Sequence, residues 1–485
     1  MARNHVASSI LREARPFVRG PARLAAAACI LTCAVAAFAE PRQRVQLREI
    51  DVPRDAGLSV VAGGDDGSAY LHGTAQTATQ FAWRRLRSLP DGSTTTIDVA
   101  DDPSARFTWF VTAGSGTTAF LSTSQVVLVD ADDAPTHLAG TLGKAYDAAM
   151  RGGVLHVLEE RPGAGRDTVW GAEVLHADGS RRDVPDLGVI RDLGDAIFGP
   201  TLPGLGDARA VVSSPTSIQM DAQGRLHATF LVRTAYAGDT PESREIATRT
   251  VDSDGNVTVV ALPDVPPLSE TPGLQILRGE FRVADDGTEW FVRTLSHVGS
   301  GQAEFTDIAA RAPGGATATT SLRPRTRGFG GRQRFLGDVA ADGRFVAVTS
   351  EVAAAGTSRT LQLVWRRFDS PSADGTMRSQ RRVLVNRLAT VGADGGPSGF
   401  EARAYRVAVA PDGTCLVATA TRSAIRSQAR LRLLVVNPAG RIVFRHVRRV
   451  SSEISLDVAA CGDRGFIVLP MDDSGSDTTA IHLVR

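Results

Sequence analysis

Arginine is the residue type most densely gathered in this chain. Five arginines fall within one short stretch, namely Arg323, Arg325, Arg327, Arg332 and Arg334. A guanidinium group offers planar, paired donors that suit carboxylates and phosphates. The stretch therefore predicts a binding site for an anionic ligand, either an anionic glycan or a protein surface.

The surrounding segment is basic as a whole. Residues 321–450 hold 23 Arg against eight Asp or Glu, a net charge of +15. The whole chain carries +1 and residues 1–39 carry +4, so the remainder carries 1 − 15 − 4 = −18. Basic and acidic units that pair across their interfaces would give the same division, and the sequence leaves both interpretations open. Without residues 1–39 the net charge is −3, which argues against a nucleic-acid partner.

Signals for other chemistry are absent from the sequence. It contains no G-x-S-x-G elbow, no H-E-x-x-H motif and no glycine-rich phosphate loop, and its nine histidines are scattered singly. The acidic turn at 252–256 lacks the ligand spacing of a calcium loop. We expect no metal and no cofactor. Two carboxylates from distant segments could still form a glycosidase or lyase site, which is the alternative function.

The first 39 residues have the pattern of a secretory signal peptide. Five arginines precede an apolar run from Leu24 to Ala39 that ends in Ala37-Phe38-Ala39. The run has 16 residues, whereas a membrane span needs about 20. We therefore expect a periplasmic or secreted protein that does not span the membrane, with residues 40–485 as one domain and a monomeric state.

Two cysteines remain once the signal peptide is removed. Cys415 follows one predicted hairpin turn, and Cys461 occupies a turn position in the next repeat. Paired cysteines in an exported chain predict a disulfide bond between them. Two separate thiols are the alternative.

The elements that must position these residues repeat along the chain. Four related phrases begin at Val283, Val339, Val409 and Val458, each set between alternating apolar stretches. Asp-Gly and related turns between such stretches predict β-hairpins, and helix signals are scarce. A unit repeated every 50 to 70 residues indicates stacked repeats. The predicted fold is all-β, a β-propeller of four-stranded blades.

The number of blades follows from the two ends. The last repeat supplies three strands, while residues 45–52 form a spare strand at the other end. Closing the ring with the N-terminal strand gives eight blades and removes exposed sheet edges. Seven blades is the alternative, because the early repeats are weak.

Two phrases carry a resemblance to a known repeat. Residues 340–350, AADGRFVAVTS, and residues 409–418, VAPDGTCLVA, resemble WD-like β-propeller repeats of bacterial periplasmic and secreted proteins. The resemblance is clearest in residues 218–485 and implies a binding scaffold without catalytic residues. Long connections, among them 324–333 and 388–401, are expected on one rim of the ring, where binding residues usually lie. We expect a non-catalytic exported scaffold that binds its ligand on this rim.

Overall fold

The computed structural model describes most of the chain after residue 44. The described ranges are 45–52, 57–76, 81–101, 109–122, 125–138, 144–163, 167–192, 208–236, 243–266, 273–298, 305–322, 335–355, 358–391, 397–398, 400–423, 428–451, 454–472 and 478–485. Every helix or strand in these ranges is a β-strand. The predicted signal peptide, residues 1–39, lies outside them.

The described strands form seven antiparallel sheets. One holds β2 (Leu58–Gly63), β3 (Ala69–Gln76), β4 (Phe81–Ser88) and β5 (Thr94–Asp101). The next holds β6 (Trp109–Thr112), β7 (Thr118–Leu121), β8 (Val126–Val129) and β9 (Pro135–Leu138). Another holds β19 (Leu274–Val283), β20 (Glu289–His297), β21 (Phe305–Arg311) and β22 (Thr317–Leu322). Another holds β28 (Phe400–Val409), β29 (Cys415–Ser423), β30 (Gln428–Val436) and β31 (Ile442–Ser451).

Two sheets have more than four strands. The five-stranded sheet holds β23 (Phe335–Val339), β24 (Phe345–Ala355), β25 (Ser358–Phe368), β26 (Ser379–Val391) and β27 (Pro397–Ser398). The nine-stranded sheet holds β10 (Lys144–Arg151), β11 (Val154–Pro162), β12 (Thr168–His176), β13 (Arg181–Val184), β14 (Ile190–Asp192), β15 (Ala208–Met220), β16 (Leu226–Tyr236), β17 (Ser243–Val251) and β18 (Val257–Val259). In it, β14 pairs with both β12 and β15 and so joins two four-stranded groups.

The seventh sheet combines the two ends of the described chain. It holds β32 (Ile454–Cys461), β33 (Gly465–Asp472), β34 (Thr478–Val484) and β1 (Gln46–Val52). β1 pairs with β34 in an unbroken antiparallel register from Gln46 opposite Val484 to Val52 opposite Thr478. The spare N-terminal strand expected from the sequence therefore lies beside the last strand.

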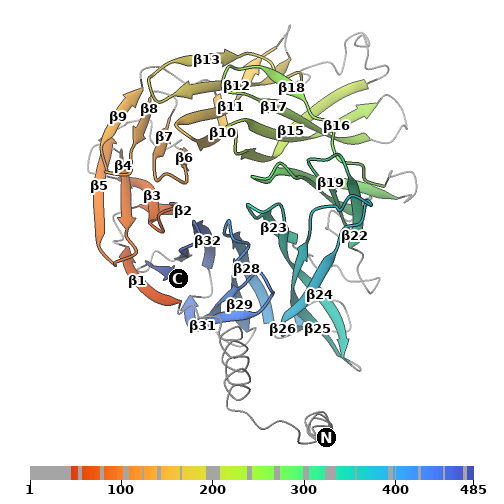
Figure 1. Cartoon of the computed structure of the whole chain (residues 1–485). Coiled ribbons are helices and arrows are strands. Elements are labelled where there is room, and N and C mark those ends of the chain that lie inside the picture. Colours follow the sequence, from red (N-terminus) through yellow and green to blue (C-terminus); the bar gives the residue numbers. More distant parts are fainter. Residues whose placement is uncertain are drawn as a thin grey trace, which may run out of the picture. The chain divides into compact units, whose positions relative to one another are not determined.

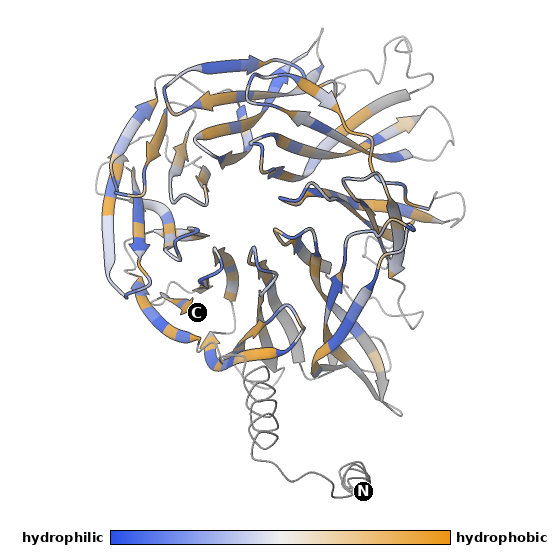
Figure 2. Ribbon diagram, in the orientation of Figure 1, coloured by the Kyte–Doolittle hydropathy of each residue, from blue (hydrophilic) through white to orange (hydrophobic). Residues whose placement is uncertain are grey.

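The first strands of successive groups contact one another. Within residues 45–485, the contacts run β2 to β6, β10, β15, β19, β23, β28, β32 and again to β2, and the sheets follow one another around a common centre (Figure 1). This is a β-propeller arrangement. Apolar residues alternate with polar ones along many strands (Figure 2), and buried clusters such as Leu416, Leu431, Leu456 and Phe466 fill the space between neighbouring sheets.

The hairpin turns lie where the sequence predicts them. The turn glycines adopt positive φ, at Gly67, Gly92, Gly116, Gly153, Gly179, Gly224, Gly255, Gly287, Gly315, Gly343, Gly375, Gly413 and Gly440. At the turn between β8 and β9, the positive φ belongs to Asp133, at 68°. Glycine adopts this conformation without the steric cost that other residues meet.

Several first-hairpin turns are held by a side chain of the preceding group of four strands, which for the turn at Gly224 belongs to the same nine-stranded sheet. The carbonyl of the turn glycine accepts the bond in each case, from His482 Nε2 at Gly67 (3.1 Å), Arg85 Nη1 at Gly116 (3.4 Å), His156 Nε2 at Gly224 (3.2 Å) and Trp290 Nε1 at Gly343 (3.0 Å). These bonds satisfy backbone carbonyls that stacking would otherwise remove from water. Neighbouring sheets are thus joined by polar contacts as well as by apolar packing.

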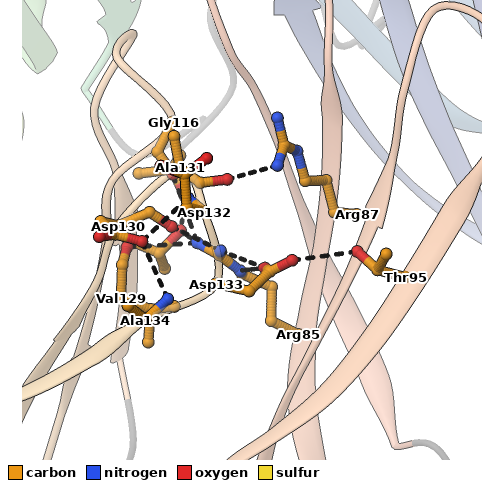
Figure 3. A network of polar contacts seen from close by, with 12 residues as sticks. Arg85, Arg87, Thr95, Gly116, Val129, Asp130, Ala131, Asp132, Asp133 and Ala134 are labelled. Carbon is orange, nitrogen blue, oxygen red and sulfur yellow. Dashed lines mark hydrogen bonds and ion pairs between the residues drawn. The ribbon is translucent and has the colours of Figure 1, made fainter.

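Arg85 makes the densest of these connections (Figure 3). Its side chain is fully buried and extends from β4 to the β8–β9 turn of the next sheet. There it forms an ion pair with Asp133 and donates to the carbonyls of Asp130 (2.6 Å) and Val129 (3.2 Å). Thr95 donates to the second carboxylate oxygen of Asp133 at 3.2 Å. Arg85 alone therefore supplies donors to one carboxylate and two carbonyls of a turn in the adjoining sheet.

Three buried histidines make the stability of the fold sensitive to acid. Burial lowers the pKa of His72 to about 3 and those of His156 and His482 to about 4. An unfolded histidine titrates near 6.5. Below that pH the unfolded chain binds more protons than the folded chain. The free energy of unfolding therefore falls as the pH drops from about 7 towards 4.

We expect a loss of the order of 1 kcal/mol per histidine for each pH unit in that window. Urea unfolding at a series of pH values from 7.5 to 4.5 measures it. The variant His156→Gln should have a shallower pH slope than the wild type, whereas His137→Gln, at an exposed site, should not. Equal slopes for all three proteins would contradict the assignment.

Candidate functional site

The arginines predicted to bind an anion lie outside the described residues. Arg323, Arg325, Arg327, Arg332 and Arg334 all fall in the connection between β22, which ends at Leu322, and β23, which begins at Phe335. The search for a site therefore turns to the described arginines of the same basic segment.

Several arginines of this segment are neutralised by carboxylates. Glu351 accepts from Arg366 at 2.6 Å and from Arg381 at 3.0 Å. Arg367 pairs with Asp369 at 3.1 Å. Charge matching thus accounts for part of the basic segment, as one of the two interpretations of the sequence expects.

Ion pairs also connect different sheets. Arg448 of β31 pairs with Glu49 of β1 at 3.3 Å, and Arg282 of β19 lies 3.5 Å from Asp338 of β23. Exposed pairs of this kind contribute at most about 1 kcal/mol each.

Four other arginines gather on the outer strands of the sheet β28–β31. Arg430 and Arg432 lie on β30, and Arg445 and Arg449 lie on β31. In the register, Arg430 is opposite Arg449, and Arg445 is opposite Leu434, two residues beyond Arg432. Alternation along each strand places all four side chains on one face. We call this group the arginine cluster.

The sequence of β30 explains why the cluster lies at one end of the sheet. Leu431 and Leu433 are fully buried against the sheet that contains β32. On the opposite face, Leu434 and Val436 are buried in a cluster shared with Leu384 of the neighbouring sheet. Arg432 and Arg430 continue that second face beyond its apolar part, towards the end of the sheet where β30 begins.

The arginine cluster has no carboxylate partner among the described residues. Burial, together with the charges of Arg445 and Arg430, lowers the pKa of Arg432. Among the described residues, the buried Nη1 atom of Arg432 has no hydrogen-bond partner, and neither has the buried hydroxyl of Thr419. Like charges directly opposite each other on paired strands are destabilising, and unpaired buried donors cost further free energy. The cluster therefore presents donors and positive charge for an acceptor that the described chain does not supply.

A sequence signal for the arginine cluster existed. The segments at 430–436 and 441–450 are recognisable as two strands joined by a tight turn, with arginines two residues apart on the first, Arg430 and Arg432, and four residues apart on the second, Arg441, Arg445 and Arg449. Reading that spacing across the hairpin would have placed the arginines on one face. The prediction looked instead for binding residues on the long connections.

Two buried carboxylates bear on the alternative enzymatic function. Glu159 of β11 and Glu173 of β12 lie close in the register of one sheet. Each forms an ion pair at 2.7 Å, Glu159 with Arg161 and Glu173 with Arg181. Burial raises the pKa of Glu173, although the charge of Arg181 opposes that rise. Both carboxylates are bound by arginines of their own sheet.

The structure does not contain the predicted disulfide bond. Cys415 and Cys461 are both free and buried. Cys415 packs with Trp365 and Tyr405, facing the sheet that contains β23. Cys461 packs with Leu58, facing the sheet that contains β2. The two thiols point away from each other on neighbouring sheets, and burial raises the pKa of Cys415 to about 12.

The described residues hold no group of three or more His, Cys, Asp or Glu side chains placed to bind a metal ion. No helix within the described ranges is long and apolar enough to cross a membrane.

Comparison with known proteins gives distant likenesses of fold. No family model and no curated protein matches the sequence. A PL25 ulvan lyase has a TM-score of 0.39 at 10% identity, covering 90% of this chain and 96% of that chain. The polysaccharide lyase Uly1 has a TM-score of 0.40 at 10% identity, covering 84% of this chain and 99% of that chain. The β-propeller domain of the trilobed protease from Pyrococcus furiosus has a TM-score of 0.38 at 9% identity, covering 78% of this chain and 94% of that chain. Likeness at this level says nothing about activity.

Proposed function

We propose that this protein is an exported, non-catalytic β-propeller scaffold that binds an anionic glycan through the arginine cluster. Export is supported by the signal pattern of residues 1–39. The observation that carries the binding proposal is the arginine cluster itself, in which four arginines share one face and no carboxylate partner is found among the described residues. Arginine in such density favours a partner with many negative charges.

We further propose eight blades in a closed ring. The pairing of β1 with β34 supports closure, as does the contact of β32 with β2. The two four-stranded groups within the nine-stranded sheet support the count. A closed ring gives the scaffold a rigid frame on which surface residues keep their positions.

The position of the arginine cluster supports binding at one end of its sheet. β26 ends at Val391 and β28 begins at Phe400, so most of the expected connection 388–401 lies between them. Antiparallel pairing brings the start of β28 to the end of the sheet where β30 begins. The basic connection 323–334 links two strands of the preceding sheets.

Retention on immobilised heparin tests this function. We expect the wild type to bind at low salt and to elute as salt rises above about 0.15 M, because screening shortens the reach of exposed charges. Replacing Arg430, Arg445 and Arg449 with serine should abolish retention. Replacing Arg182, Arg233 and Arg441, three exposed arginines elsewhere, removes the same charge and should leave most of the retention.

Two further arms of the experiment separate the possible outcomes. A variant with Arg323, Arg325 and Arg327 replaced by serine measures the share of the predicted connection. Stronger retention on poly-L-glutamate than on heparin would point to an acidic protein instead of a glycan. A wild type that passes unretained through both columns, or equal losses in the cluster and control variants, would contradict the proposal.

A further inference from the structure

Thr419 and Arg432 form a pair of buried donors to which the described residues offer no acceptor. They lie directly opposite each other on β29 and β30, so their side chains leave the same face of the sheet. Thr419 is 2% exposed. Its hydroxyl and the Nη1 atom of Arg432 are both buried, and neither has a hydrogen-bond partner in the described part of the chain.

The neighbouring positions on this face show how unusual the pair is. Val417 and Leu434, the next pair along the same two strands, are fully buried apolar residues in the cluster shared with the sheet β23–β27. Apolar side chains at 419 and 432 would continue that packing without unsatisfied donors. The chain instead has a hydroxyl and a guanidinium at the boundary between the apolar core and the exposed arginines.

Donors reach this boundary from three strands. Thr419 is on β29, Arg432 is on β30, and Arg445 extends from β31. The charge of Arg445 contributes to the lowered pKa of Arg432, as does that of Arg430 on the other side. A carboxylate has two oxygens to offer, whereas a sulfate or phosphate ester has three free oxygens and can accept from all three directions.

We propose that Thr419, Arg432 and Arg445 form a subsite for an ester-linked tetrahedral oxyanion, a sulfate or phosphate monoester carried by the glycan. This inference rests on the proposed function, because the exposed arginines would bring the polymer to the surface. The subsite adds selectivity, because the buried hydroxyl and guanidinium would donate hydrogen bonds to one charged group of the right shape and hold it away from water.

Binding of two polymers that differ only in the charged group tests the subsite. Dextran sulfate carries sulfate esters, and polygalacturonate carries carboxylates alone. We expect the wild type to bind dextran sulfate more tightly than polygalacturonate at equal charge and salt. Thr419→Val, which keeps the shape of the side chain, should weaken dextran sulfate binding by about 10- to 100-fold and leave polygalacturonate binding unchanged. Thr306→Val, at a buried threonine in the sheet β19–β22, is the matched control.

A second variant separates a ligand-binding role from a structural one. Arg432→Met replaces an unsatisfied half-buried cation with an apolar side chain of similar length. If the arginine serves a ligand, this change should keep or raise the melting midpoint while removing the stabilisation that dextran sulfate gives the wild type. A lower midpoint with undiminished binding would assign Arg432 to the fold and overturn the subsite.

The remaining outcomes distinguish this inference from the proposed function. Equal affinity for the two polymers, with both lost in the Arg430, Arg445 and Arg449 variant, would leave the scaffold standing and refute the subsite. Loss of all polyanion binding in the wild type would refute both. Competition by inorganic sulfate against inorganic phosphate then identifies which ester the subsite prefers.

Discussion

Replacing Arg85 with alanine is expected to lower the free energy of unfolding by about 3–5 kcal/mol. The side chain is fully buried, and its removal takes the guanidinium partner from the carboxylate of Asp133 and one donor from each of the carbonyls of Asp130 and Val129. Removing the guanidinium partner of a largely buried carboxylate is among the costliest changes a point substitution can make. Chemical denaturation of wild type and variant measures the difference.

Two further variants check that the effect comes from this network. Asp133→Asn keeps a residue that tolerates the positive φ at this turn but removes the charge, so it should destabilise less than Arg85→Ala. Arg441→Ala removes an exposed arginine and should change stability by less than about 0.5 kcal/mol. A loss in Arg85→Ala no larger than that of Arg441→Ala would show that the two sheets do not depend on this contact.

The turns and the strand pairing could be predicted because their determinants are local. The turns at Gly343 and Gly413 require a residue with positive φ, and the Asp-Gly pairs in the sequence predict such turns. The pairing of β1 with the C-terminal sheet followed from counting strands. The bounds of the strands could not be predicted as well as the turns. β15 begins at Ala208 and continues through Pro215, because a bulge between Pro215 and Ser217 accommodates the proline inside the strand.

Contacts between sheets could not be predicted in the same way. Cys415 and Cys461 come from neighbouring repeats, but the side a strand residue faces changes with each step along the chain, and here the two thiols face opposite neighbours. His156 and Trp290 bond to turn carbonyls more than 50 residues away. Composition shows that a segment is basic, but only the side-chain contacts show that Arg366 has a carboxylate partner, whereas Arg432 has none among the described residues.

Deleting residues 45–52 is expected to abolish the native fold at moderate temperature. The deletion removes β1, whose seven residues all pair with β34, and exposes the edge of β34. It also removes Ile50 and Val52, which are buried in the cluster between this sheet and the sheet β2–β5. Burial of two such side chains contributes about 3–6 kcal/mol, which is comparable with the whole stability of a typical domain, about 5–15 kcal/mol.

Thermal melts and light scattering of the truncated and full-length proteins measure this effect. Ile50→Asp offers a milder test, because it keeps the strand but places a charge in the apolar cluster, and it should lower the midpoint markedly. Asp51→Asn, at the adjacent exposed position of β1, should leave the midpoint unchanged. If the truncated protein melted and scattered like the full chain, the pairing of β1 with β34 would contribute nothing to the fold, and the proposed closure of the ring by the N-terminal strand would fail with it.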